Sequence, residues 1–191
     1  MPANLPQALG FLIGFWLAIV LLTPIGARGD TPREGPAREA STGFSGGPGA
    51  GLSGDVSGLG PLEAELAQTV SAWRQDRNLV ALVRVPALDA VARNHSADMA
   101  RRGFFSHDTP EGANPVDRIH AGGVSHFSLA GENVGMTSRS NPNAEIFQGW
   151  LASPDHHDNL VAPAFNATGV GIARRADGTL FYTQVYVTFP R

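Results

Sequence analysis

The sequence has no cysteine and no lysine among its 191 residues, so all 14 positive charges are arginine. Without cysteine there is no disulfide bond, thiolate metal site or cysteine nucleophile. Without lysine, Schiff-base and lysine-nucleophile mechanisms are excluded. The formal net charge of -3 argues against a nucleic-acid partner held through its phosphates. The lack of cysteine does not decide the compartment, because an exported domain with a sufficient core needs no disulfides.

The longest apolar stretch is N-terminal, over residues 8–27. It is long enough to cross a bilayer. Its centre, 9–22, also has the length of a signal-peptide core, and I-G-A at 25–27 is an acceptable cleavage site. We therefore predict that 1–27 is either a signal peptide or an N-terminal membrane anchor. The protein is expected to be extracytoplasmic: secreted, periplasmic or membrane-tethered, with membrane contact only through this segment.

Residues 28–60 form a linker by composition, since Gly, Pro and Ser fill 17 of their 33 positions. Such a segment buries too little apolar surface to offset its ordering entropy, so we predict that it is disordered. One domain is then expected over 61–191, and it should fold without the linker.

Within this domain, helical patterns come first and a hairpin comes last. A run at 79–85 is apolar but short, and is interpreted as a loop or a brief strand. This order predicts an α+β domain in layers. The spacing of apolar residues and the turn residues predict helices over 61–77, 86–102, 115–121, 141–151 and 154–160, and paired strands over 168–175 and 179–189.

One acidic residue, Glu132, lies in an apolar run that has the pattern of a short buried strand. A buried carboxylate needs a partner, a hydrogen bond or a cation. Histidines could supply it, because all six lie between His95 and His157. The alternative is that Glu132 lies on the surface, in a turn made by Gly131 and Asn133.

Taken one at a time, the other polar residues indicate little. His95 lies on the apolar face of a predicted helix and is interpreted as a core histidine, whereas His120 and His126 flank a glycine-rich turn and should be exposed. There is no H-E-x-x-H zinc helix and no G-x-S-x-G nucleophile elbow.

The combination of motifs is more specific than its parts. In order along the chain, the sequence contains F-F-S-H at 104–107, P-x-G at 110–112, N-P-V-x-R-I at 114–119, A-G-G at 121–123, G-E-N-V at 131–134, W-L-A-S-P-x-H at 150–156, T-G-V-G-I at 168–172 and Y-T-Q-V-Y at 182–186. This set closely resembles the CAP superfamily of cysteine-rich secretory proteins, antigen 5 and pathogenesis-related 1 proteins, in its bacterial, cysteine-free, SCP-like branch. The resemblance covers about residues 62–189.

The resemblance implies an α-β-α sandwich with a small three-stranded antiparallel sheet between helical layers. Eukaryotic members have two His and two Glu in an open cleft that can bind a divalent cation. His107 and Glu132 match one of each, whereas Ser153 and Phe181 stand at the other two positions. The bacterial branch has a histidine that is matched by His156.

The resemblance therefore implies a ligand-binding cleft at His107, Glu132 and His156. These three side chains could hold a divalent cation such as Zn²⁺, although no cofactor is required, or they could form a hydrogen-bonded structural cluster. Four further motif residues are expected to support the cleft: Asn133, Ser153, Asn159 and Gln184.

Three functional classes stay open. We expect the first class, an exported module that binds a lipid, a peptide or a cell-wall ligand. The protein could instead be a metal-assisted or peptidase-like hydrolase that uses His107 and Glu132, although the motifs contain no nucleophile. It could also be a structural cell-surface protein. The sequence does not identify a catalytic residue, the ligand or the oligomeric state.

Overall fold

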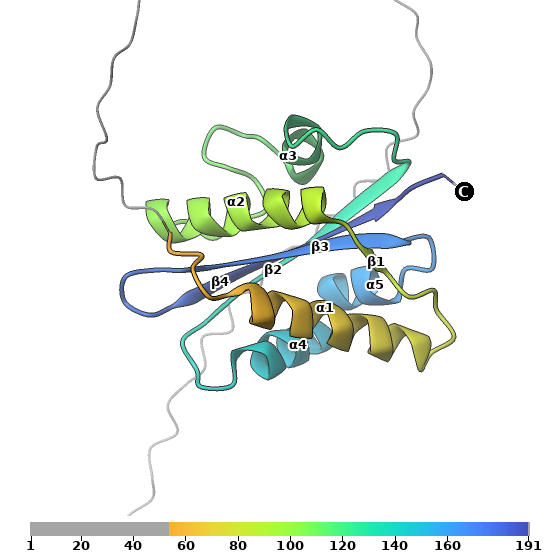
Figure 1. Ribbon diagram of the computed structural model, residues 1–191, viewed down its shortest axis with the longest axis horizontal. Coiled ribbons are helices and arrows are strands. Elements are labelled where there is room, and N and C mark those ends of the chain that lie inside the picture. The colour runs from red at the N-terminus through yellow and green to blue at the C-terminus, as the bar shows by residue number, and fades with distance from the viewer. Residues whose placement is uncertain (1–53, 191) are drawn as a thin grey trace, which may run out of the picture.

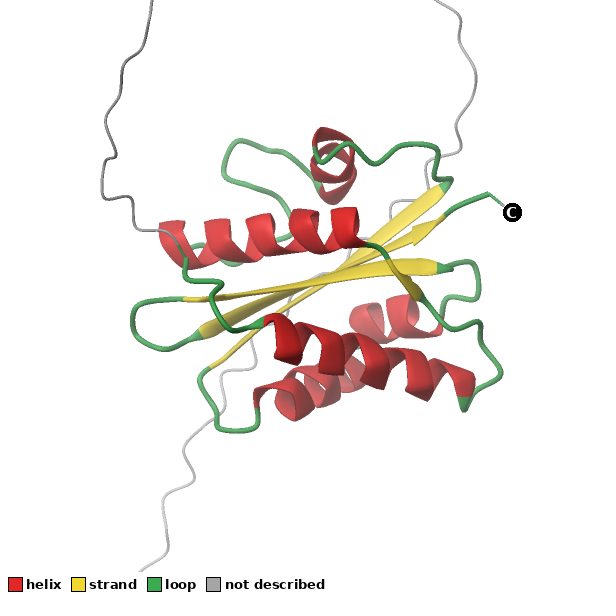
Figure 2. Cartoon of the chain, viewed as in Figure 1, coloured by secondary structure: helices red, strands yellow, loops and turns green. Residues whose placement is uncertain are grey.

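The computed structural model describes residues 54–190, in which helices cover both faces of one sheet (Figure 1 and Figure 2). Helices α2 and α3 lie on one face, and α1, α4 and α5 lie on the other. The predicted α-β-α sandwich is therefore confirmed. The elements are α1 (Gly60–Gln75), β1 (Val83–Arg84), α2 (Pro86–Arg102), α3 (Pro115–Ala121), β2 (Leu129–Thr137), α4 (Pro142–Ala152), α5 (Pro154–Val161), β3 (Ala167–Arg174) and β4 (Leu180–Thr188).

The sheet has four strands in the order β1-β3-β4-β2. Strand β4 pairs antiparallel with both β2 and β3, as the resemblance implied. The fourth strand, β1, runs parallel to β3, with Val83 opposite Ala167 and Arg84 opposite Thr168. The expected three-stranded antiparallel sheet is thus corrected to a mixed sheet of four strands. Strand β1 has only two residues, too few for an alternating pattern to show in the sequence.

Helix α2 lies directly on β3, because two glycines leave no side chain between the two backbones. A Cβ at Gly169 would lie 2.1 Å from the carbonyl carbon of Leu88. A Cβ at Gly171 would lie 2.0 Å from the backbone nitrogen of Arg93. The motif at 168–172 is therefore a packing requirement of the fold.

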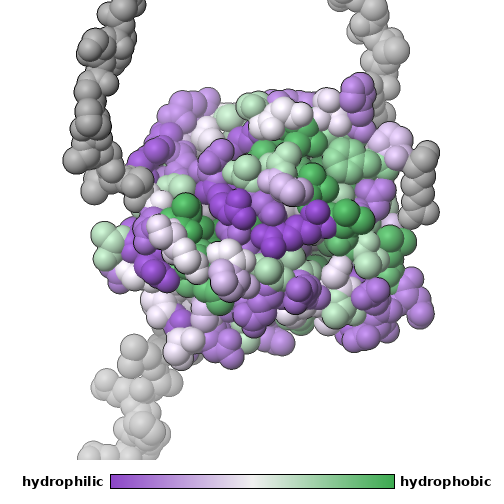
Figure 3. Space-filling model, in the orientation of Figure 1, coloured by the Kyte–Doolittle hydropathy of each residue, from purple (hydrophilic) through white to green (hydrophobic). Residues whose placement is uncertain are grey.

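Where β3 extends beyond β1, two of its backbone N–H groups donate to carboxylates instead of to a neighbouring strand. The N–H of Val170 donates to Asp89 over 2.9 Å, and the N–H of Ile172 donates to Glu63 over 3.1 Å. Arg93 pairs with Glu63 at 2.6 Å and so balances its charge. Figure 3 looks onto this edge of the sheet and shows a strip of hydrophilic residues across the middle of the surface.

Arg74 in α1 is fully buried, and within residues 54–190 its side-chain hydrogen bonds all go to main-chain carbonyls. The C-terminal carbonyls of a helix carry partial negative charge, so a buried guanidinium can be held at such an end. Burial lowers the pKa of Arg74. The contacts fix α1 to the end of α5 and to the loop that follows. The four acceptors are the carbonyl oxygens of Val80, Leu160, Ala162 and Phe165, at 2.7–3.2 Å.

The domain begins before the predicted boundary at residue 61. Asp55 exchanges two backbone hydrogen bonds with Arg174, of 3.0 and 2.8 Å, and Leu59 is a core residue with 1% exposure. The last residues of the predicted linker 28–60 therefore belong to the domain. The rest of that linker, and the predicted signal peptide or anchor at 1–27, lie outside the described residues. Among the helices of 54–190, none is long and apolar enough to span a membrane.

Candidate functional site

Glu132 is buried on β2, with 1% of its surface exposed. Its Oε1 accepts a hydrogen bond from Nδ1 of His107 over 2.9 Å. Its Oε2 accepts one from Nη2 of Arg118 over 2.6 Å. A further imidazole nitrogen, Nε2 of His95, lies 4.0 Å from Oε1. The alternative of an exposed turn residue is therefore excluded, and the carboxylate is the centre of a cluster.

The charges of this cluster balance. Burial raises the pKa of Glu132, but the hydrogen bond from His107 and the positive charge of Arg118 outweigh burial, so the pKa lies below its usual range. Glu132 is therefore an anion at neutral pH. Arg118 supplies one positive charge in direct contact with it. Such a pair can be buried because each charge has its partner.

Arg118 is part of the N-P-V-x-R-I motif but was not predicted as a site residue, although it is central to the site. Besides Glu132, it donates from Nη1 to the carbonyls of His107, over 2.6 Å, and Ala113, over 2.9 Å. Helix α3, which carries it, begins at a capping box in which Asn114 and Asp117 bind each other's backbone. The signal that could have found it is charge balance, because a buried Glu132 calls for a cation.

The sequence pattern predicts a core histidine at His95, and the residue is buried, with 1% exposure. Its Nε2 lies 2.9 Å from the carbonyl oxygen of Ser106, which fixes the loop that carries His107. Burial lowers the pKa of His95, although the negative charge of Glu132 opposes this shift. His95 therefore stays neutral at neutral pH, and its contact with Ser106 positions the loop that carries His107.

His156 comes from the other helical layer. It lies on α5, and its ring centroid is 6.4 Å from that of His107. Strand β2, which carries Glu132, is the terminal strand of the sheet. Burial is the main cause that lowers the pKa of His156 to about 4. Among the described residues, neither His107 nor His156 has a hydrogen-bond partner at Nε2, and both atoms are buried.

Two of the four supporting residues hold α5 against β2. Asn133 donates to the carbonyl of His156 over 3.1 Å. Asn159 donates to the carbonyl of Glu132 over 3.1 Å and to the side-chain oxygen of Asn133 over 2.9 Å. A Cβ at Gly131 would lie 2.6 Å from the Asn159 oxygen, so the G-E-N motif needs its glycine. These residues position His156 and are themselves 0% exposed.

The other two supporting residues lie elsewhere. Gln184 is fully buried and stands opposite Asn133 in the sheet. Side chains alternate between the faces of a strand, so Gln184 shares the face of Asn133 and lies on the opposite face from Glu132. Nε2 of Gln184 donates to Oγ1 of Thr168 over 3.1 Å, and its support of the cleft stays a prediction. Ser153 is half-buried at the junction of α4 and α5, where its N–H donates to the carbonyl of Gly149 over 3.1 Å.

The sequence left two interpretations open for His107, Glu132 and His156: a divalent-cation site or a hydrogen-bonded cluster. Within residues 54–190, no group of three or more His, Cys, Asp or Glu side chains could hold a metal ion. The physical reason is Arg118, whose guanidinium takes one carboxylate oxygen of Glu132 while His107 takes the other. Hydrogen bonds join Glu132 to His107 and Arg118, whereas Nε2 of His156 has no partner among the described residues.

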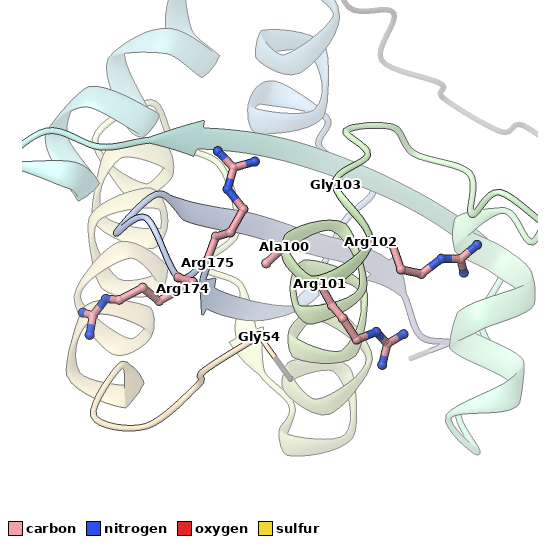
Figure 4. Close-up of a pocket in the computed structure, with 8 residues that line it drawn as sticks. Gly54, Ala100, Arg101, Arg102, Gly103, Arg174 and Arg175 are labelled. Atoms are coloured by element: carbon pink, nitrogen blue, oxygen red, sulfur yellow. The ribbon is translucent and has the colours of Figure 1, made fainter. Parts of the chain in front are cut away.

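A separate hollow of about 300 Å³ lies at the end of α2, and four arginines line it. Their guanidinium groups do not converge on a common point (Figure 4). Three are paired with carboxylates: Arg101 with Asp98, Arg102 with Glu111, and Arg175 with Asp177. Paired arginines that do not converge form no anion site, so we do not assign this hollow as the functional site.

The motifs that build the cluster agree with a known family. A family model, CAP, described as the cysteine-rich secretory protein family, matches residues 68–186. The chain belongs to the CAP family. Its CAP domain contains the whole cluster described above, including Arg118, and lacks the cysteines for which the family is named.

Two curated relatives come from Bacillus subtilis. The protein YkwD is 30% identical over 131 residues, which cover 69% of this chain and 49% of YkwD. The membrane protein YlbC is 34% identical over 97 residues, which cover 51% of this chain and 26% of YlbC. The chain therefore spans half or less of the curated relatives that it matches.

Solved structures show the same fold. An extracellular protein with an SCP domain from Bacillus anthracis is 34% identical, with a TM-score of 0.57 over 66% of this chain and 40% of that one. An outer surface protein from Borrelia burgdorferi has a TM-score of 0.65 over 72% of this chain and 99% of that one. At 19% identity, this second likeness concerns the fold alone.

Proposed function

We propose that this CAP domain is an exported binding module whose cleft at His107, Glu132 and His156 holds a small hydrophobic or cell-envelope ligand. One observation carries the proposal. The Nε2 atoms of His107 and His156 are buried and have no partner among the described residues. A buried polar atom without a partner costs free energy. A ligand that formed hydrogen bonds with these two Nε2 atoms would recover that free energy.

The extracytoplasmic location is part of the same proposal. The apolar stretch at 8–27 has the length of an export signal or an anchor. The matched Bacillus anthracis protein is described as extracellular, and the Borrelia burgdorferi protein as an outer surface protein. A ligand from the lipids, peptides or wall of the cell envelope fits this location.

A hydrolase is the second candidate, and the contact between Glu132 and His107 favours it. A carboxylate that orients an imidazole through Nδ1 leaves Nε2 as a general base. However, no described hydroxyl group is hydrogen-bonded to Nε2 of His107. Such an enzyme would therefore have to activate water rather than a serine or threonine. The binding role needs no such step and is preferred.

Thermal unfolding of the full chain tests the proposal. We would add, in turn, a lipid extract and soluble wall fragments from a bacterial envelope. A ligand that binds only the folded state raises the midpoint by mass action. Wild type should gain several degrees with one fraction, and Glu132→Gln should lose that gain.

The matched control is His126→Asn. His126 is exposed, lies outside the cluster and has a φ of 61°, which asparagine tolerates. It should behave as wild type. If neither fraction stabilises wild type, or if all three proteins gain equally, the binding role is wrong. Release of a cleaved product from the wall fragments, detected by mass spectrometry, would favour the hydrolase.

A further inference from the structure

The hydrogen bonds of the cluster determine which nitrogen of His107 carries a proton. An ionised carboxylate can only accept hydrogen bonds. Because Glu132 accepts from Nδ1 of His107 over 2.9 Å, that nitrogen must carry the hydrogen. In a neutral imidazole the other nitrogen, Nε2, then presents a lone pair. This is the atom that is buried without a partner among the described residues.

Arg118 is the permanent cation of this cluster. Its guanidinium already gives Glu132 one full counter-charge at 2.6 Å. The side chains of Glu132, His107 and Arg118 are only 1%, 7% and 12% exposed. A second positive charge, on His107, would have no anion of its own in this buried place, and burying an unpaired charge is costly.

We propose that Arg118 sets the hydrogen-bond polarity of the cleft, so that Nε2 of His107 accepts from an uncharged hydroxyl or amide N–H group of the ligand. This inference rests on the proposed binding function and names the ligand class. The donor group could belong to a lipid alcohol or to a sugar of the wall, because both present the same chemistry to an imidazole lone pair.

Carboxylates and phosphates fit poorly in the same place. An incoming anion would meet the lone pair of His107 and the negative charge of Glu132 behind it. The two terminal nitrogens of Arg118 are occupied by Glu132 and by the carbonyls of His107 and Ala113. Its Nε–H is buried without a partner in the described part of the chain, but one donor does not offset a full negative charge. The cleft should therefore discriminate against anions.

The first test is NMR of the full chain labelled with ¹⁵N-histidine, in which long-range ¹H–¹⁵N spectra show which ring nitrogens are protonated. At pH 7.5, wild-type His107 should be protonated at Nδ1 and not at Nε2. Arg118→Met should lose this pattern, because Glu132 would then draw its counter-charge from the ring. The control Arg139→Met removes an exposed arginine that pairs with Glu145 at 2.8 Å, and it should match wild type. A proton on Nε2 in wild type would overturn the inference.

The second test compares matched probes: 1-hexanol, methyl pentyl ether and hexanoate, with the N-acetylglucosamine trimer as the sugar arm. Hexanol or the trimer should shift the Nε2 resonance of His107 and bind about tenfold more tightly than the ether and hexanoate, as expected for one hydrogen bond. A response to hexanol alone indicates a lipid alcohol, and a response to the trimer alone indicates a wall sugar.

Two variants reverse the expected preference. Arg118→Met removes the cation, and if it fails to fold, Glu132→Gln keeps the shape and leaves Arg118 without its anion. Glu132→Gln should bind hexanoate more tightly than wild type does. Equal binding of hexanol and hexanoate by wild type, or no shift of His107 with any probe, would overturn the inference. A carboxylate ligand recovered from the host would overturn it while leaving the binding function standing.

Discussion

Arg74→Met should lower the free energy of unfolding by an amount that follows directly from the contacts of Arg74. Methionine has a similar length but no charge and no donor. It would leave four carbonyls of the α1–α5 junction without the guanidinium, two of them within 3.0 Å of Nη1 at present. Hydrogen bonds to charged groups contribute about 1.5–3 kcal/mol each. Release of the guanidinium from its buried state offsets part of that loss, so we expect a net cost of about 3–5 kcal/mol.

Urea denaturation at pH 7 measures this cost. The matched control is Arg77→Met, one turn further along, where the arginine is exposed, stacks on Trp73 and makes one hydrogen bond, to the Trp73 carbonyl. The control should lose less than about 1 kcal/mol. Arg74→Lys should fall between the two, because an ammonium group has three donors and a different geometry. A loss below about 1 kcal/mol for Arg74→Met would refute the view that Arg74 ties the helical layer together.

Three further predictions concern the core. Trp150→Ala should cost about 3–5 kcal/mol in urea melts, because Trp150 is 2% exposed and donates to a β2 carbonyl; a cost below about 1 kcal/mol would contradict its core position. Gly171→Ala should cost about 3 kcal/mol or more by forcing α2 off the sheet, whereas Gly149→Ala, with open space around it, should be neutral or stabilising. A chain that begins at residue 61 should melt several degrees below one that begins at 54, because it loses Leu59; equal midpoints would place the true boundary at 61.

The layers of the fold could be predicted because the sequence pattern of each helix and of the hairpin matches the structure that the segment adopts. Proline at the start and a 3.6-residue apolar period mark the helices, and alternation with a tight turn marks the β3–β4 hairpin. Strand β1 could not be predicted, because its two residues have meaning only beside β3. The burial of Leu59 was missed for a similar reason, since a single leucine among glycines has the composition of a linker.

The candidate site was predictable only in part. Glu132 is recognisable because a carboxylate in an apolar strand needs partners, and His107 follows from the family motif. Arg118 was missed because an arginine in a seven-residue helix has the pattern of a surface residue. The face on which Gln184 lies could not be predicted, because a motif gives the order of residues but not the face of the strand. Its register opposite Asn133 shows that it lies across the sheet from Glu132.

Native mass spectrometry of the full chain recovered from its own host tests the proposed binding cleft most directly. We predict that wild type retains a small molecule, that His126→Asn retains the same mass, and that Glu132→Gln loses it. Wild type that carries no ligand would contradict the claim of a binding cleft. A mass retained equally by all three proteins would also contradict it, because the ligand would then lie away from Glu132.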